Sequence, residues 1–306
     1  MLLAVTHPVS SPFLVPFDGS FSVSGAPTAP SDDGGGKKER KERKKQYKDA
    51  LEETIDEIRE LQRTMYAADS HSVLLVFQAM DAAGKDGTIR AVMNGVNPAG
   101  CQVSSFKKPS SEELDHDFLW RVSKRLPERG RIGIFNRSHY EDVLVVRVHP
   151  EYLGGQRIPG TENMDAGALD AFFAQRYESI RNYEQHLAHN GTVVVKFWLN
   201  VSRDEQRDRF LTRIDEPASN WKFNPGDVAE RKCWDGYMSA YESALNETSR
   251  PWAPWYAVPA DDKPYMRSVV ADIFKRTLEG LGSAYPTLSK GDREEMLALR
   301  AELAES

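Results

Sequence analysis

Short runs of β-branched and aromatic residues alternate along this chain with longer stretches of helical periodicity. The runs fall at residues 72–77, 102–106, 131–135, 192–200 and 254–260. Parallel strands require a crossover connection, usually a helix that covers one face of the sheet. The alternation therefore predicts an α/β fold in three layers, with a five-stranded parallel sheet between two layers of helices. Because ligands of such sheets bind beyond the carboxyl ends of the strands, functional residues are expected directly after each run.

The segment after the first run, QAMDAAGKDGTIRA at residues 78–91, reads as a phosphate-binding loop with two departures. The usual pattern is G-x-x-x-x-G-K-[ST], in which backbone amides and a lysine hold phosphate oxygens. Ala79 stands where the first glycine is expected, and Asp86 stands where a hydroxyl should follow Lys85. Small residues still let the backbone approach an anion closely. The predicted phosphate-binding residues are therefore Ala82, Ala83, Gly84, Lys85, Asp86, Gly87 and Thr88.

A carboxylate inside this loop, Asp81, has two interpretations. A phosphate ligand would repel it unless the carboxylate holds Mg2+ or accepts a proton from an attacking oxygen. Alternatively, Asp81 forms a turn by binding its own backbone, as aspartates commonly do. The sequence favours the metal or catalytic role and leaves the turn open.

Polar residues also follow the third run, in the segment RIGIFNRSHYEDVLVVRVHP at residues 131–150. Asn136 and Arg137 come directly after the strand, on the ligand-binding side of the predicted sheet. An arginine binds an oxyanion through two parallel hydrogen bonds. Glu141 and Asp142 offer the oxygen ligands that Mg2+ needs in phosphoryl transfer. The alternative is that both acids only cap the start of a helix.

Cationic residues gather in two further places. Lys107 and Lys108 follow the second run, whereas Arg209 and Arg213 lie four residues apart and so share one face of a predicted helix. That helix belongs to a segment of about fifty residues between the fourth and fifth runs, too long for a simple crossover. We interpret this segment, about residues 202–250, as a helical lid whose cations bind a long polyanion. An inert insertion with a salt-bridged surface is the alternative.

The two ends of the chain differ from its middle. Residues 1–36 are rich in Ser, Pro and Gly and are predicted to form a disordered tail. Residues 283–306 are predicted to be a C-terminal tail or helix, which leaves residues 37–282 as the catalytic domain. The helix that follows the first tail begins with a basic stretch, which either contacts a polyanion or simply faces water.

Composition argues against several classes of protein. The formal net charge is -6 and the pI is about 5.7, which argues against general nucleic-acid binding. Cys101 and Cys233 are far apart, so neither a disulfide framework nor a zinc module is expected, and a reducing, cytoplasmic location fits best. No apolar run approaches the roughly 20 residues of a membrane-spanning helix, so no membrane partner is expected.

The ordered set of motifs resembles that of the polyphosphate kinase 2 family. The segments that carry the resemblance span about residues 45–282 and read FQAMDAAGKDGTI, NPAGCQVSSFKKPSSEELDHDFLWR, GRIGIFNRSHYEDVLVVRVHP, FWLNVSRDEQRDRFLTRIDEP, NWKF and WAPWYAVPAD. The family's loop is similar to G-x-D-A-A-G-K, which explains Asp81 and the displaced hydroxyl, although Ala79 departs from its leading glycine. The resemblance implies a P-loop kinase-like core with a helical lid, inorganic polyphosphate as phosphoryl donor, and Mg2+ or Mn2+ as cofactor.

The resemblance also implies the acceptor and the roles of individual residues. The motif NRSHYED at residues 136–142 is similar to that of the third class, which converts AMP to ADP and ADP to ATP. The resemblance implies three catalytic residues. Asp81 would be a metal ligand and base, Lys85 would bind the transferring phosphoryl group, and Arg137 would stabilise the charge of that group. Asn136, Glu141 and Asp142 would line the nucleotide and metal side, and Arg209 and Arg213 would reach over from the lid. A homo-oligomer, dimer or tetramer, is implied as well.

Two other functions stay open at this point. The first is an ATP-dependent nucleoside or nucleotide kinase, in which the cationic lid is only a surface. The second is a non-catalytic protein that binds polyphosphate or nucleotides. The acids Asp81, Glu141 and Asp142 argue against the second, because carboxylates weaken anion binding unless a metal uses them.

Overall fold

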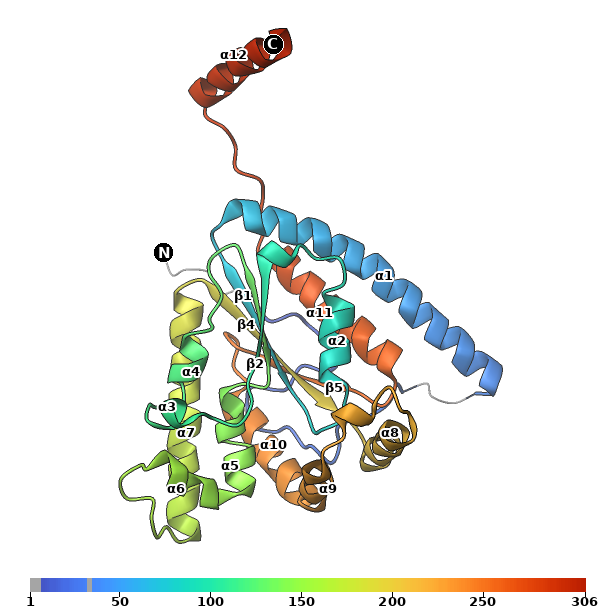
Figure 1. Ribbon diagram of the computed structural model, residues 1–306, viewed down its shortest axis with the longest axis vertical. Coiled ribbons are helices and arrows are strands. Elements are labelled where there is room, and N and C mark those ends of the chain that lie inside the picture. The colour runs from blue at the N-terminus through green and yellow to red at the C-terminus, as the bar shows by residue number, and fades with distance from the viewer. Residues whose placement is uncertain (1–6, 32–34) are drawn as a thin grey trace.

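In a computed structural model, which describes residues 7–31 and 35–306, the five runs form one parallel sheet. The strand order is β2-β3-β1-β4-β5 (Figure 1). The strands are β1 (Ser72–Gln78), β2 (Cys101–Ser105), β3 (Ile132–Asn136), β4 (Thr192–Asn200) and β5 (Trp255–Pro259). Every residue of β1 is buried, because helices cover both faces of the sheet at its centre. The α/β fold predicted from the sequence is confirmed.

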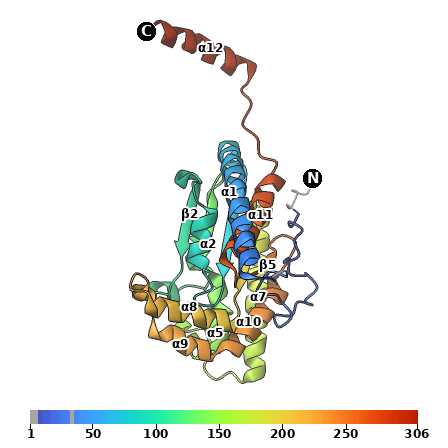
Figure 2. The same ribbon diagram turned by 90° about the vertical axis from the view of Figure 1, so that its right-hand side faces the viewer.

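Helices form the two outer layers (Figures 1 and 2). One layer holds α1 (Lys37–Ala68), α2 (Lys85–Val92) and α11 (Lys263–Gly280), with α1 and α11 packed along each other. The other layer holds α7 (Ala166–His189) and α10 (Trp234–Thr248), together with the short α5 (Val145–Val148) and α6 (Leu153–Gln156). The segment before α10 forms α8 (Arg203–Asp215) and α9 (Pro225–Lys232), which lie beyond one end of the sheet.

The register of the sheet decides which side chains meet. Phe77 of β1 pairs with Asn136 of β3 on one side and with Phe197 of β4 on the other. The residues that follow β1 and β3 therefore leave the same edge of the sheet as neighbours. This is the edge where α/β proteins bind their ligands.

The pattern of SSEELDHDFLWRVSKRL at residues 110–126 predicts one continuous helix after the second strand, capped by Ser110 and Glu113, and the structure shows that this prediction is wrong. The predicted cap is present, since the Ser110 hydroxyl accepts a 3.2 Å hydrogen bond from the Glu113 amide, and Glu113 reaches back to the Ser110 amide. However, the segment contains only two single turns, α3 (Ser111–Leu114) and α4 (Trp120–Ser123). Between them the Asp117 carboxylate accepts a 2.9 Å hydrogen bond from the Leu119 amide. This bond forms a local turn, which competes with a continuous helix.

Residues 7–31 do not match the disordered tail predicted from composition. Val15 is fully buried, its amide donates to the Trp255 carbonyl, and the Ala257 amide donates to the Phe13 carbonyl. The segment thus adds to the outer edge of β5, where an edge strand otherwise exposes backbone groups. Composition could not indicate this, because the edge that orders the segment is formed by residues far along the chain. The remaining residues of the predicted tail lie partly outside the described ranges.

The C-terminal residues stand apart from the body of the protein. After α11 the chain leads to α12 (Lys290–Glu305), which projects away from the sheet (Figure 1). All residues of α12 are exposed. In the part of the chain that the structure describes, no helix is both long and apolar enough to cross a membrane.

Candidate active site

The loop after β1 turns through two residues in the left-handed conformation. Ala82 has a φ of 61° and Gly84 a φ of 106°. Glycine adopts this conformation freely, whereas alanine pays about 1–2 kcal/mol for it. The loop leads into α2 at Lys85, so the positive end of the helix dipole adds to the amides of the turn. A strained, compact loop at a helix start is suited to holding an anion.

Lys85 folds back across the loop. Its ammonium group donates a 2.7 Å hydrogen bond to the Ala79 carbonyl and lies 3.4 Å from the Met80 carbonyl. Burial, followed by the charge of Arg137, lowers the pKa of Lys85. Thr88, predicted to bind phosphate, does not line the cavity of this site. It is buried in α2, and its hydroxyl donates to the Gly84 carbonyl at 3.0 Å instead of facing open space.

Arg137 joins the ends of β1 and β3. Its guanidinium group donates to the Asp81 carboxylate at 2.8 Å and to the Glu141 carboxylate at 3.3 Å. Its own backbone has a φ of 63°, a left-handed strain that is unusual for a residue with a side chain. Glu141, ahead of Asp81, holds the pKa of the Arg137 guanidinium above its ordinary value. Arg137 is therefore a permanent cation between two carboxylates.

A second hydrogen-bonded pair lies at the same edge of the sheet. The Asn136 side-chain amide donates a 2.6 Å hydrogen bond to the Asp86 carboxylate. Asn136 ends β3 and Asp86 lies in the first turn of α2. The pair ties the phosphate-binding loop to the neighbouring strand.

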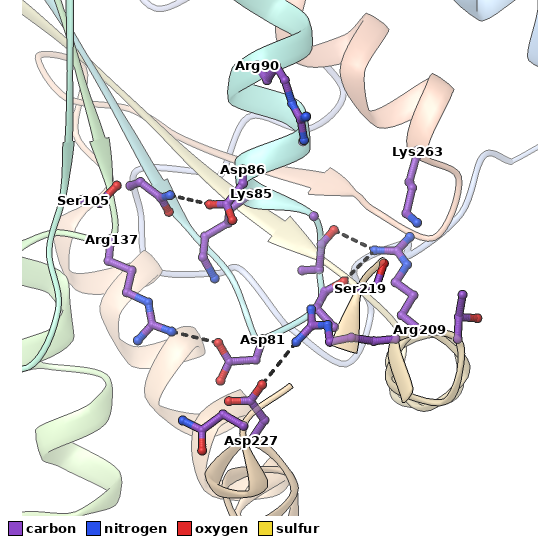
Figure 3. A pocket seen from close by; sticks show the side chains of 18 of the residues that line it. Asp81, Lys85, Asp86, Arg90, Ser105, Arg137, Arg209, Ser219, Asp227 and Lys263 are labelled. Carbon is purple, nitrogen blue, oxygen red and sulfur yellow. Dashed lines mark hydrogen bonds and ion pairs between the residues drawn. The ribbon is translucent and has the colours of Figure 1, made fainter. Parts of the chain in front are cut away.

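These residues open onto a cavity of about 1080 Å³ (Figure 3). One wall is the phosphate-binding loop. The opposite wall is formed by α8 and α9, from which Arg209 and Asp227 face the loop. Among the described residues, nine cationic side chains line it: Lys85, Arg90, Lys107, Lys108, Arg137, Arg209, Arg213, Lys263 and Arg267. Six carboxylates do so as well: Asp81, Asp86, Glu205, Asp208, Glu216 and Asp227. The excess of positive charge suits a highly charged anion.

Arg209 differs from the other cations because its donors are already engaged. Its guanidinium group makes hydrogen bonds to the carbonyls of Ala82 (3.1 Å), Ala83 (2.7 Å), Ala260 (2.6 Å) and Asp261 (3.1 Å), and one to Glu205 (2.7 Å). It was expected to bind the phosphate chain, but in this arrangement it holds the backbone of the loop. Arg213 lies one turn further on and pairs with Asp227 at 3.3 Å.

A smaller cavity of about 270 Å³ lies on the other side of the Arg137–Asp81 pair. Both residues line the two cavities, so the pair stands where they meet. Apolar and aromatic side chains line the smaller cavity, among them Met80, Leu144, Tyr237 and Tyr241, and so does the carboxylate of Glu141. One cavity is thus rich in cations, and the other offers surfaces suited to a ring system.

A comparison with known families decides the identity of this fold and site. The family model described as Polyphosphate kinase 2 matches residues 41–283, most of the chain. The chain belongs to the polyphosphate kinase 2 family. The family resemblance predicted from the sequence motifs is confirmed.

Relatives and solved structures of the polyphosphate kinase 2 family agree with this. An ADP-polyphosphate phosphotransferase of Rhodopseudomonas palustris is 54% identical over 260 residues, which cover 85% of this chain and 89% of the relative. An AMP/ADP-polyphosphate phosphotransferase of Meiothermus ruber is 48% identical over 229 residues, covering 75% and 80%. The crystal structure of Polyphosphate Kinase 2 from Arthrobacter aurescens TC1 superposes with a TM-score of 0.80 at 37% identity and covers 94% of each chain.

One residue expected at this polyphosphate kinase 2 site lies elsewhere. Asp142 is buried, accepts a 2.7 Å hydrogen bond from Gln156 and lies 3.6 Å from the guanidinium group of Arg176. Burial raises the pKa of the Asp142 carboxyl. It lines neither cavity, so its prediction as a metal and nucleotide ligand is not supported. The reason is that Asp142 follows Glu141 in a tight helical turn, where adjacent side chains point in different directions.

The cavity also contains residues that were not predicted. Lys263 and Arg267 come from the first turns of α11, Arg90 from α2, and Asp227 from α9. Lys263 lies four residues after β5, so the rule that functional residues follow strands could have found it. The sequence could not indicate Asp227 in this way, because Asp227 does not follow a strand. It reaches the cavity only because α9 folds over the end of the sheet.

Proposed function

We propose that the protein transfers the terminal phosphoryl group of inorganic polyphosphate to AMP and ADP, forming ADP and ATP, with Mg2+ as its cofactor. The observation that carries this proposal is the convergence of Asp81, Lys85 and Arg137 on the large cavity, at a place where Asp81 and Arg137 also line the small cavity. The names of the Rhodopseudomonas palustris and Meiothermus ruber relatives support the donor, and between them they support both acceptors.

The two cavities suggest where each substrate binds. We assign polyphosphate to the large cavity, because a row of cations can neutralise successive phosphates of one chain. We assign the acceptor to the side of the small cavity, where Tyr237, Tyr241 and Leu144 offer a surface for a purine ring and Glu141 lies close by. Asn136, also expected on the nucleotide side, opens onto the large cavity. The reacting phosphates then meet beside Arg137.

The chemical step is an in-line displacement. A phosphate oxygen of AMP or ADP forms a bond to the terminal phosphorus of polyphosphate, and the bond from that phosphorus to the next bridging oxygen breaks. The shortened polyphosphate leaves with the electron pair of the broken bond. Because the acceptor oxygen is already ionised, no strong base is needed, and alignment with charge neutralisation carries the acceleration. Lys85 and Arg137, which both line the large cavity, provide that neutralisation.

The carboxylates of the site fit a magnesium ion that is shared with the substrate. Mg2+ is typically held by one or two carboxylates together with substrate phosphates and water. Asp81 and Glu141 both contact the Arg137 guanidinium, so they present hard oxygen ligands to one region. No group of three acidic, histidine or cysteine residues comes together as a metal site in residues 7–31 and 35–306. Asp81 would hold the ion, which when bound neutralises charge on the phosphate oxygens.

The segment of α8 and α9 supports a further part of the proposal. Residues of this segment, among them Thr212, Ser219 and Asp227, form one wall of the large cavity. We propose that it acts as a lid that excludes water from the transferring phosphoryl group.

Three further proposals concern the whole protein. They are the catalytic-domain limits at residues 37–282, the homo-oligomeric state and the cytoplasmic location. Limited proteolysis, sedimentation and cell fractionation test them in turn.

The proposed function is tested with purified protein, Mg2+, long-chain polyphosphate and AMP in the absence of ATP. Chromatography of the nucleotides should show ADP first and ATP later. If ADP forms from AMP but no ATP follows, the acceptor is AMP alone. If AMP does not react but ADP supplied in its place does, the acceptor is ADP alone. Absence of product from either acceptor, with activity restored when ATP replaces polyphosphate, would favour an ATP-dependent nucleotide kinase instead.

A further inference from the structure

The start of α1 carries a concentration of positive charge that the active site does not use. Residues 37–48, KKERKERKKQYK, hold eight lysines and arginines against two glutamates, in a chain whose net charge is -6. We call these residues the basic segment. Its six lysines are all exposed. Sequence alone left open whether this stretch contacts a polyanion or only faces water.

The basic segment lies against the beginning of α11, next to the large cavity. The Lys44 ammonium group is 3.4 Å from the Asp262 carboxylate, and the ring of Tyr47 is 5.0 Å from that of Tyr265. Asp262 caps α11 and directly precedes Lys263, which lines the cavity. Helices α1 and α11 run side by side in both views (Figures 1 and 2). The positive charge of α1 therefore begins at a wall of the active site.

Four lysines of the basic segment form a stripe. Lys37, Lys41, Lys44 and Lys48 recur at spacings of four, three and four residues, which places them on one face of the helix. Lys44 fixes the direction of that face, because it contacts α11. At the usual rise per residue, the stripe extends over about 16 Å.

The cavity wall next to the stripe is itself crowded with cations. Lys263, Arg267 and Arg90 line it together. Burial and then the charge of Arg209 lower the pKa of Lys263, and burial and then the charge of Arg90 lower the pKa of Arg267. The Arg267 Nε is buried and has no hydrogen-bond partner among the described residues. Cations that repel one another at a cavity wall are stabilised when an anion lies among them.

We propose that the basic segment is a second binding site for the polyphosphate chain. With the terminal phosphoryl group at Lys85 and Arg137, the chain runs past Lys263 and Arg267 and leaves the cavity. Its distal phosphates then bind the lysine stripe of α1. The inference rests on the proposed function for the identity of the chain, and it adds a preference for long donors. A short donor remains inside the cavity, whereas a long one releases additional counterions along α1.

The test compares long-chain polyphosphate with tripolyphosphate on the variant Lys37→Gln/Lys41→Gln/Lys48→Gln. Lys44 is kept because it contacts Asp262. The matched control is Lys290→Gln/Arg293→Gln/Arg300→Gln, which removes the same charge from exposed positions of α12 at the opposite end of the molecule. For long chains we expect KM to rise about tenfold, equivalent to about 1.4 kcal/mol of binding. The KM for tripolyphosphate, the kcat with either donor and the control variant should stay unchanged, and the salt dependence for long chains should become shallower.

Other results would overturn the inference. An equal loss with both donors would mean that the lysines act on the fold or on the cavity itself. No change with either donor would mean that the basic segment only faces water. Direct binding of long-chain polyphosphate to wild type and variant, measured by calorimetry without an acceptor, separates this inference from the proposed function. A threefold or greater loss of binding in the variant would support the second site even if no turnover occurred. Lost binding of a single-stranded oligonucleotide with unchanged polyphosphate binding would assign the segment to nucleic acid.

Discussion

Arg137 and Asp81 lie 56 positions apart in the sequence, yet the Arg137 guanidinium group donates a 2.8 Å hydrogen bond to the Asp81 carboxylate. The contact exists because β1 and β3 are neighbours in the sheet and each residue follows its strand closely. It places a permanent cation and a carboxylate at the junction of the two cavities.

The first prediction concerns the carboxylate of this pair. Asp81→Asn should lower kcat by about 10²–10³-fold, comparable to the loss of one preorganised electrostatic group in other enzymes. The melting temperature should change little, because Arg137 keeps its contact with Glu141. Steady-state kinetics and thermal unfolding check this. Asp208→Asn makes the same charge change at the cavity without touching Arg137, and it should retain most activity. Near-normal turnover of Asp81→Asn would refute its catalytic role.

The second prediction concerns the clamp on the phosphate-binding loop. Arg209→Ala leaves four backbone carbonyls without their donor, among them those of Ala82 and Ala83, and should destabilise the protein by about 2–4 kcal/mol. Urea unfolding measures this difference. Arg207→Ala on the same helix removes a side chain that is 53% exposed, and should cost no more than about 0.5 kcal/mol. Similar losses in the two variants would show that the clamp does not stabilise the loop.

The third prediction concerns a buried ion pair between β4 and α7. The Lys196 ammonium group lies 2.5 Å from the Glu184 carboxylate, and both side chains are almost fully buried. Burial lowers the pKa of Lys196 from 10.5 to about 8, although Glu184 opposes the shift. Between these values the unfolded chain holds a proton that the folded protein has lost. The contribution of Lys196 to stability therefore rises with pH from about 8 to about 10.5.

A neutral variant isolates this pH dependence. Lys196→Met/Glu184→Gln replaces the pair by uncharged side chains of similar size. From pH 7.5 to pH 9.5, the free energy of unfolding of wild type should rise relative to the variant by about 1–2 kcal/mol. Denaturant unfolding at the two pH values measures it. A constant difference between the proteins would mean that Lys196 keeps its ordinary pKa in the folded state.

The fourth prediction concerns the cofactor. Because no three-ligand acidic cluster occurs in the described part of the chain, Mg2+ should bind weakly to the protein alone and firmly only with substrate phosphates. Adding Mg2+ should therefore raise the melting temperature only when polyphosphate or nucleotide is present. EDTA should abolish turnover and leave the melting temperature of the substrate-free protein unchanged. A large stabilisation by Mg2+ without substrate would indicate a preformed metal site and contradict this.

Much of the site followed from local patterns. Gly84 and Lys85 could be placed at a strand–helix junction because the strand, the small residues and the helix start are contiguous in the sequence. Asn136 and Arg137 could be placed at the same edge because both follow a predicted parallel strand. These inferences need only the periodicity of each segment and the rule that parallel strands end together.

Other residues could not be interpreted locally. Asp142 looked equivalent to Glu141, but it turns inward to Gln156 and Arg176, which lie on later helices. Residues 7–31 had the composition of a disordered tail, but β5 provides an edge and a buried site for Val15. In both cases the outcome depends on partners that are distant in the sequence.

The sequence by itself determined the parallel α/β architecture, the family and the edge of the sheet that carries the chemistry, since each depends on patterns within contiguous segments. Only the tertiary structure decided how individual charges are used. It turned Arg209 toward the loop backbone, buried Asp142, brought Asp227 and Arg267 to the cavity, and set the basic start of α1 beside α11. The physical reason is that a side chain's burial and hydrogen-bond partners are set by neighbours in space, and helices and strands packed together bring those neighbours from anywhere along the chain.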